Sequence, residues 1–242
     1  MADKATSNAA EPPKPVHIGG ESFVDRVLPH IKKIVIATVV LAVILSIVVG
    51  IRWFGERKQR ATTEQLDHVL EVARQPIRGK DEKLDPKRPS FASAKERAEA
   101  LLALAGVEAA GPVFRGGLLL DAGRFDDSVA EYRKGSADQT ITGALCREGI
   151  GLAIEAKATA GKDSAARQKG LEEALAAFVA MQPDEAGPRR AYALYHQGRI
   201  QLLLGKRAEA KAQFEAAKTA NKDGDRELME MVEQRLAALG AS

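Results

Sequence analysis

The chain has 242 residues, of which 45% are hydrophobic, 29% are charged and only 5% are aromatic. Abundant alanine and scarce aromatic side chains favour packed helices over a β-sandwich. The single cysteine, Cys146, excludes an intrachain disulfide framework and a multi-cysteine zinc site. The net charge of +3 gives no reason to expect a nucleic-acid partner.

The beginning of the chain offers little that could be buried. Residues 1–21 are rich in alanine, proline and glycine, so we predict a disordered tail. Residues 22–33 start with a helix-capping spacing, Ser22 and Asp25, followed by apolar residues at helical intervals. This pattern predicts a short amphipathic stub at a membrane surface or, as an alternative, a simple lead-in to the next helix.

An uncharged run of 18 residues, Ile34 to Ile51, contains 13 isoleucine, valine or leucine residues. As a helix the run is about 27 Å long, close to the bilayer hydrocarbon thickness of about 30 Å. Trp53 and Phe54 suit the membrane interface, so the sequence predicts a transmembrane helix over residues 34–54. A buried core helix and a strand are the alternatives, but the run lacks a polar stripe and exceeds ordinary strand length.

The apolar run is expected to remain as an anchor. It is longer than the apolar core of a signal peptide, about 7–15 residues, and no small-x-small cleavage site follows it. Three basic residues precede it closely and four follow it, so the flanking charges do not decide its orientation.

Helical periodicity dominates the remaining sequence. Residues 55–91 contain an apolar helical face at Leu66, Val69 and Leu70 and then a charged loop with three prolines. From residue 92 to 242 no segment alternates with period two, and every long segment has helical spacing. The predicted fold is all-α, with one N-terminal transmembrane helix followed by a helical domain.

Small and aromatic residues recur through this helical domain. Counted from Ala191, repeat positions 4, 8, 15, 20, 24 and 27 hold Leu194, Gly198, Gly205, Ala210, Phe214 and Ala217. Counted from Ala109, positions 8, 11, 15, 17, 20 and 24 hold Gly116, Leu119, Gly123, Phe125, Ser128 and Tyr132. A stretched middle copy matches at Gly149, Leu152, Ala174 and Phe178, and its 13 extra residues predict longer helices with a polar connector.

The pattern resembles the tetratricopeptide repeat (TPR), a helix–turn–helix unit. Gly198 and Ala210 are small where two helices would touch, Gly205 would supply the turn, and an aromatic residue such as Phe214 would fill the wedge between hairpins. The resemblance implies a TPR-like α-solenoid, with helices near 92–104 and 225–239 covering its ends. An irregular helical bundle with accidental glycines is the alternative.

In the TPR frame, first-helix positions 2, 5, 9, 12 and 13 face a concave surface that binds peptides. In the last copy these positions hold Tyr192, Tyr195, Arg199, Leu202 and Leu203. Tyrosine and arginine are enriched in protein contacts, so we expect a partner to bind here. The alternative is that these side chains pack between repeats.

No catalytic motif is found. Residues 160–164 resemble part of a phosphate-binding loop but lack its first glycine, its Ser/Thr and the preceding strand. The four histidines have no metal-ligand spacing, and Cys146 lies among apolar residues typical of a core. We therefore expect a non-enzymatic protein without metal, cofactor, small-molecule substrate or nucleic acid.

The order of a polar tail, one membrane helix and degenerate TPR-like hairpins resembles the YfgM-type ancillary subunits of the bacterial SecYEG translocon. The resemblance covers the chain from about Leu28 to the end and rests on architecture. It implies an inner-membrane protein with a cytoplasmic N-terminus and a periplasmic body that associates with the translocon, periplasmic chaperones and exported chains. A scaffold for another envelope complex (division, secretion or motility) and a cytoplasmic scaffold at the inner face remain open.

Overall fold

The computed structural model describes residues 31–79, 85, 87–222 and 224–240. The described chain is helical, and its only β-structure is a pair of isolated bridges, Ile77–Phe91 and Asp85–Arg88. The all-α class is therefore confirmed. The chain divides into two compact units, Met1–Lys58 and Gln59–Ser242. The tail predicted for residues 1–21, and residues 22–30 of the predicted stub, lie outside the described residues.

Helix α2 runs without a break from Ile31 to Ala73. Along its apolar stretch the structure describes the side chains of Leu41 and of residues 43–49, and all of them are exposed. Their large aliphatic members have exposed fractions of 45% to 63%. Successive helical residues are rotated by about 100°, so seven in a row point in all directions around the axis. The described side chains of this stretch are therefore exposed around the helix axis.

Among the described residues, no single helix combines the length and the apolar character needed to cross a membrane. One bent pair, Ala94–Leu102 with Val107–Asp121, meets the criterion by length and composition only, with an angle of 113° between its parts.

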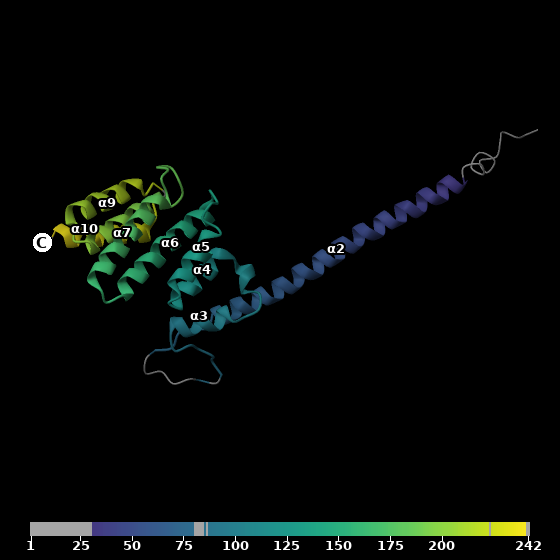
Figure 1. The fold of residues 1–242 in the computed structure, drawn as a ribbon, viewed down its shortest axis with the longest axis horizontal. Helices are drawn as coiled ribbons and strands as arrows, with labels where there is room; N and C mark the ends of the chain where they lie inside the picture. The colour runs from purple at the N-terminus through teal and green to yellow at the C-terminus, as the bar shows by residue number, and fades with distance from the viewer. Residues whose placement is uncertain (1–30, 80–84, 86, 223, 241–242) are drawn as a thin grey trace, which may run out of the picture. The chain divides into compact units, whose positions relative to one another are not determined.

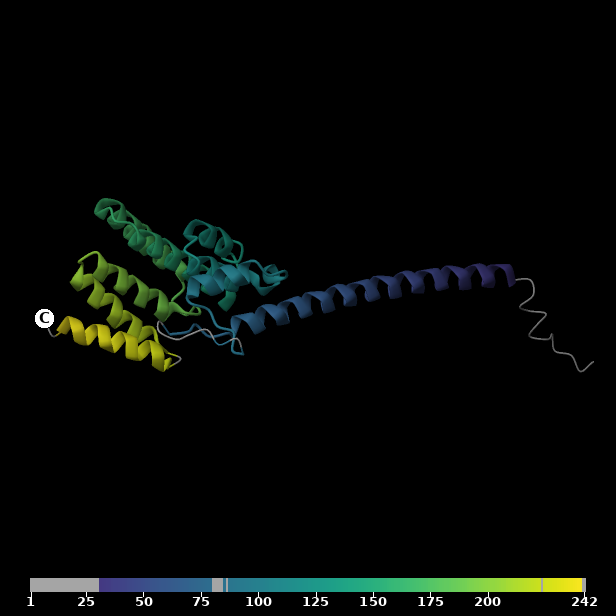
Figure 2. The same ribbon diagram turned by 90° about the horizontal axis from the view of Figure 1, so that it is seen from below.

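Three helix hairpins follow one another in the second unit (Figures 1 and 2). Their helices are α4 (Gly111–Asp121) with α5 (Phe125–Arg133), α6 (Ile141–Ala160) with α7 (Ser164–Met181), and α8 (Arg190–Leu203) with α9 (Arg207–Ala220). They are flanked by α3 (Ala94–Leu102), the short 3-10 helix η2 (Val107–Ala110) and α10 (Arg226–Gly240). The two predicted flanking helices are confirmed, since α3 packs on α4 and α10 packs on α9.

The outer two hairpins have the same turn. Gly123 and Gly205 have φ angles of 76° and 77°, a left-handed conformation that glycine adopts without strain. The next amide closes each turn, with Arg124 N donating to Leu119 O at 2.8 Å and Lys206 N to Gln201 O at 2.9 Å.

The middle hairpin turns differently. Its helices have 20 and 18 residues, as the predicted lengthening requires, and Gly161 in the connector has a φ of −74°. The Asp163 carboxylate caps α7 by accepting a hydrogen bond from Ala165 N at 3.0 Å.

The two kinds of turn predict different responses to alanine. Gly205→Ala should lower the free energy of unfolding by about 1 kcal/mol, because a Cβ disfavours the left-handed conformation. The matched control Gly161→Ala should be neutral or slightly stabilising, because its φ of −74° suits any residue. Thermal unfolding of the full-length variants, followed by circular dichroism, measures both changes. Equal losses at the two positions would contradict the assignment of Gly205.

Each hairpin is closed by a glycine that lies against an aromatic ring. A Cβ added to Gly116 would lie 2.7 Å from the Tyr132 ring, and one added to Gly198 would lie 2.8 Å from Phe214. In each pair the two residues are 16 positions apart. In the middle hairpin the equivalent contact joins Gly151 to Phe178, 27 positions apart, whereas Gly149 lies against Tyr132 of the preceding hairpin. The residue equivalent to Gly116 and Gly198 is therefore Gly151, two positions after the predicted Gly149. The insertion in the middle hairpin is accordingly 11 residues long, and the predicted length of 13 is wrong.

The small residues at repeat position 20 are buried as the pattern predicts. Ser128, Ala174 and Ala210 all have exposed fractions of 0%. Ser128 also donates a hydrogen bond from its hydroxyl to Gly116 O at 2.8 Å. Close helix contact in each hairpin thus depends on a small residue from each helix.

Candidate protein-binding surfaces

The predicted partner-binding residues on α8 are largely occupied by contacts within the body. Tyr195 has an exposed fraction of 7% and packs against Phe214, with ring centroids 5.8 Å apart. The Tyr192 hydroxyl donates to Asp225 Oδ2 at 2.7 Å. The Arg189 guanidinium lies 3.8 Å from the centre of the Tyr192 ring. These contacts agree with the alternative interpretation of the sequence, in which the side chains pack within the body.

The remaining members of the predicted surface differ from one another. Arg199 donates to both carboxylate oxygens of Glu155, each at 2.6 Å. Leu202 is partly buried against the core, whereas Leu203 is 43% exposed. The structure therefore leaves only Leu203 of the five largely open to a partner.

A buried charge network connects α6 to the start and middle of α8. Arg189, just before α8, donates to Glu148 through Nε at 2.5 Å and Nη2 at 2.7 Å. His196 Nε2 lies 2.9 Å from Glu148 Oε1. Glu148 and Glu155 each have a side-chain exposed fraction of 9%. Their burial is compensated by paired cations, as buried carboxylates require.

The ring of His196 lies between Glu148 and Arg199. Arg199 can only donate, so Nδ1 of His196 accepts the contact from Arg199 Nη2 at 3.2 Å. The ring also stacks on Phe178 at a centroid distance of 4.7 Å. His196 therefore joins the charge network to the apolar core.

The pKa of Glu148 reflects these partners. Burial raises the pKa, but hydrogen bonds from His196 and Arg189 and the nearby positive charge outweigh this effect and hold the pKa below its ordinary value. Glu148 is thus held as a carboxylate that ties two hairpins together. The contacts of Glu148 could not be predicted from the sequence, because its partners Arg189 and His196 are 41 and 48 residues away. The available signal was a second acidic residue, Glu155, seven positions later on a helix whose other residues are mostly apolar or small.

Two further titratable side chains, Cys146 and Tyr132, are buried in the core. Cys146 has an exposed fraction of 0%, which confirms the predicted core position, and burial raises the pKa of its thiol. Burial likewise raises the pKa of Tyr132 to about 12. Among the described residues, no group of three or more His, Cys, Asp or Glu side chains is placed to hold a metal ion.

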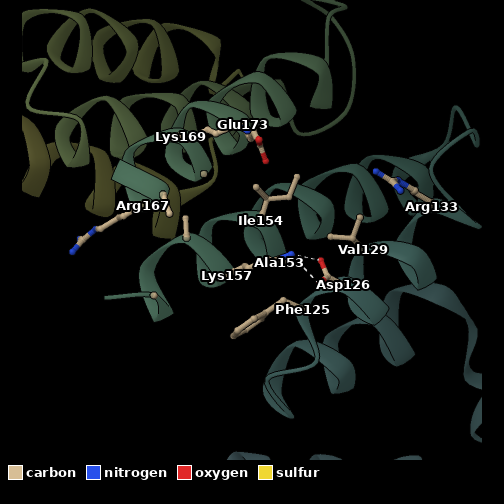
Figure 3. A pocket seen from close by; sticks show the side chains of 14 residues that line it. Phe125, Asp126, Val129, Arg133, Ala153, Ile154, Lys157, Arg167, Lys169 and Glu173 are labelled. Carbon is tan, nitrogen blue, oxygen red and sulfur yellow. Dashed lines mark hydrogen bonds and ion pairs between the residues drawn. The ribbon is translucent and has the colours of Figure 1, made fainter. Parts of the chain in front are cut away.

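A hollow of about 520 Å³ opens between α5, α6 and α7 (Figure 3). Apolar side chains of Phe125, Val129 and Ile154 line it and are only partly buried. Four basic and two acidic residues surround them: Arg133, Lys157, Arg167, Lys169, Asp126 and Glu173. No local pattern in the sequence marks this site, because its three helices come together only in the folded body.

No known protein family, curated protein or solved structure matches this chain. Its function is therefore inferred from its own residues and their geometry.

Proposed function

We propose that the protein is a membrane-anchored, non-enzymatic module for binding other proteins. The observation that carries the proposal is the apolar run of residues 34–51, whose described side chains on α2 are exposed on all sides. A helix that is apolar all round needs apolar surroundings, and lipid supplies them. The run extends beyond the described side chains, so its length as a span is taken from the sequence.

We further propose that the body is a TPR-like solenoid. The shared turns at Gly123 and Gly205 support this interpretation, as do the glycine–aromatic contacts in each hairpin. Stacked helix hairpins provide extended surfaces for protein segments, and no chemistry beyond binding is required of them.

The proposed setting is the bacterial inner membrane, with the N-terminus cytoplasmic and the body periplasmic. There the protein would act as an ancillary subunit of the SecYEG translocon, together with periplasmic chaperones, and would assist exported chains. The anchor would keep the body near the channel exit and so raise its effective concentration for emerging segments. The buried, single Cys146 is compatible with an oxidising compartment.

Reporter fusions test the orientation of the body. Alkaline phosphatase fused after Ser242 should be active, and a fluorescent protein that folds only in the cytoplasm should be dark. As a control, the same fusions to a variant lacking residues 34–51 should reverse the pattern, because the body would then stay in the cytoplasm. The reversed pattern in the full-length protein would overturn the periplasmic assignment and favour a scaffold at the inner face.

Crosslinking in intact membranes tests the partner. Recovery of translocon subunits together with nascent secretory chains is expected. Recovery of a division, secretion or motility complex in their place would contradict the translocon assignment.

A further inference from the structure

The described residues that line the hollow come from α5, α6, α7 and the connector between α6 and α7, and none comes from α8. The hollow is bounded by the second helices of two successive hairpins, with α6 between them. Its volume of about 520 Å³ is sufficient for one or two large side chains. Because Phe125, Val129 and Ile154 remain only partly buried, an apolar side chain placed here would remove more apolar surface from water.

The three helices that line the hollow differ in length. Helix α5 has 9 residues, whereas α6 and α7 have 20 and 18. The C-terminal part of α6 faces the start of α5, where Lys157 reaches Asp126, and the start of α7 completes the wall of the hollow. Gly170 of α7 lies against Ala158 of α6 and keeps these two helices close together.

The charges at the rim are not balanced. Lys157 pairs with Asp126, with Nζ 2.6 Å and 2.9 Å from the two carboxylate oxygens. This leaves Arg133, Arg167 and Lys169 with one acidic neighbour in the lining, Glu173. Residues 61–242 as a whole contain 27 basic and 28 acidic residues, so the positive excess is local. Figure 3 places Arg133 and Arg167 on opposite sides of the apolar floor.

We propose that the hollow binds an acidic segment of a partner protein that inserts one or two large apolar side chains. The apolar floor would hold the inserted side chains, and the basic rim would attract flanking carboxylates. The two acidic residues in the lining and the apolar floor disfavour a nucleic-acid backbone. This inference rests on the proposed protein-binding function and identifies the chemistry of one partner.

Two labelled peptides serve as probes. The acidic probe has two leucines flanked by four glutamates, and its basic twin has lysine in place of each glutamate. Fluorescence anisotropy with the full-length protein in lipid nanodiscs should show at least tenfold tighter binding of the acidic probe. A third peptide with serine in place of leucine should bind at least tenfold more weakly than the acidic probe. Loss of either difference would overturn the inference.

Charge reversal locates the binding site. In the double variant Arg133→Glu/Arg167→Glu the ratio of affinities for the acidic and basic probes should fall about tenfold, because both side chains are exposed at the rim. The control Lys211→Glu/Arg235→Glu changes the net charge equally on α9 and α10 and should leave the preference unchanged. An unchanged preference in the rim variant, or an equal loss in the control, would overturn the inference. Reporter fusions and crosslinking judge the proposed function separately, since neither uses these peptides.

Discussion

Phe178→Ala is expected to lower the free energy of unfolding of the helical body by about 3–5 kcal/mol. The Phe178 side chain has an exposed fraction of 0% and fills the space left by Gly151. It also stacks on the ring of His196. Its truncation would remove buried apolar contacts and open a cavity beside the charge network. The surrounding helices can close such a cavity only in part.

Thermal unfolding of the full-length protein measures this loss, with a fall in Tm of about 2–4 °C for each kcal/mol. The adjacent Val179→Ala is the matched control. Val179 is 53% exposed on the same helix, so its truncation should change stability only slightly. Equal losses at the two positions would show that Phe178 does not close the middle hairpin.

The hairpin layout could be predicted because its determinants are local. A left-handed turn needs glycine at Gly123 and Gly205, and close helix contact needs small residues such as Ser128 and Ala210. These requirements recur at fixed spacing and are visible in one sequence. The middle copy was misaligned by two residues because α6 carries both Gly149 and Gly151, and helical spacing alone does not identify which one faces Phe178.

The role of the α8 residues could not be predicted in the same way. Tyrosine and arginine are common in partner surfaces, but the same side chains also pack between helices when a counterpart is available. Arg199 meets Glu155 on α6, 44 positions earlier, and Tyr192 meets Asp225, 33 positions later. Such distant pairs leave no periodic signal. The hollow next to α6 depends likewise on three separate helices.

The second large effect is expected from the buried pair of Glu155 and Arg199. Arg199→Met should lower the free energy of unfolding by about 3 kcal/mol, because the Glu155 carboxylate would remain buried without its cation. The side-chain exposed fraction of Glu155 is 9%, and that of Arg199 is 24%. The double variant Glu155→Leu/Arg199→Met should recover most of the loss, since an apolar pair needs no compensating charge. Urea unfolding of the full-length variants separates these outcomes.

The pair of Lys157 and Asp126 provides the control, because it has the same shortest distance of 2.6 Å but side chains that are 59% and 80% exposed. Lys157→Met should therefore change stability by less than about 1 kcal/mol. If Arg199→Met lowers the free energy of unfolding far more than Lys157→Met does, burial rather than the N–O distance sets the strength of each ion pair. If the double variant were as unstable as Arg199→Met, the loss would come from the arginine's packing and its contact with His196, and Glu155 would not be the group that requires compensation.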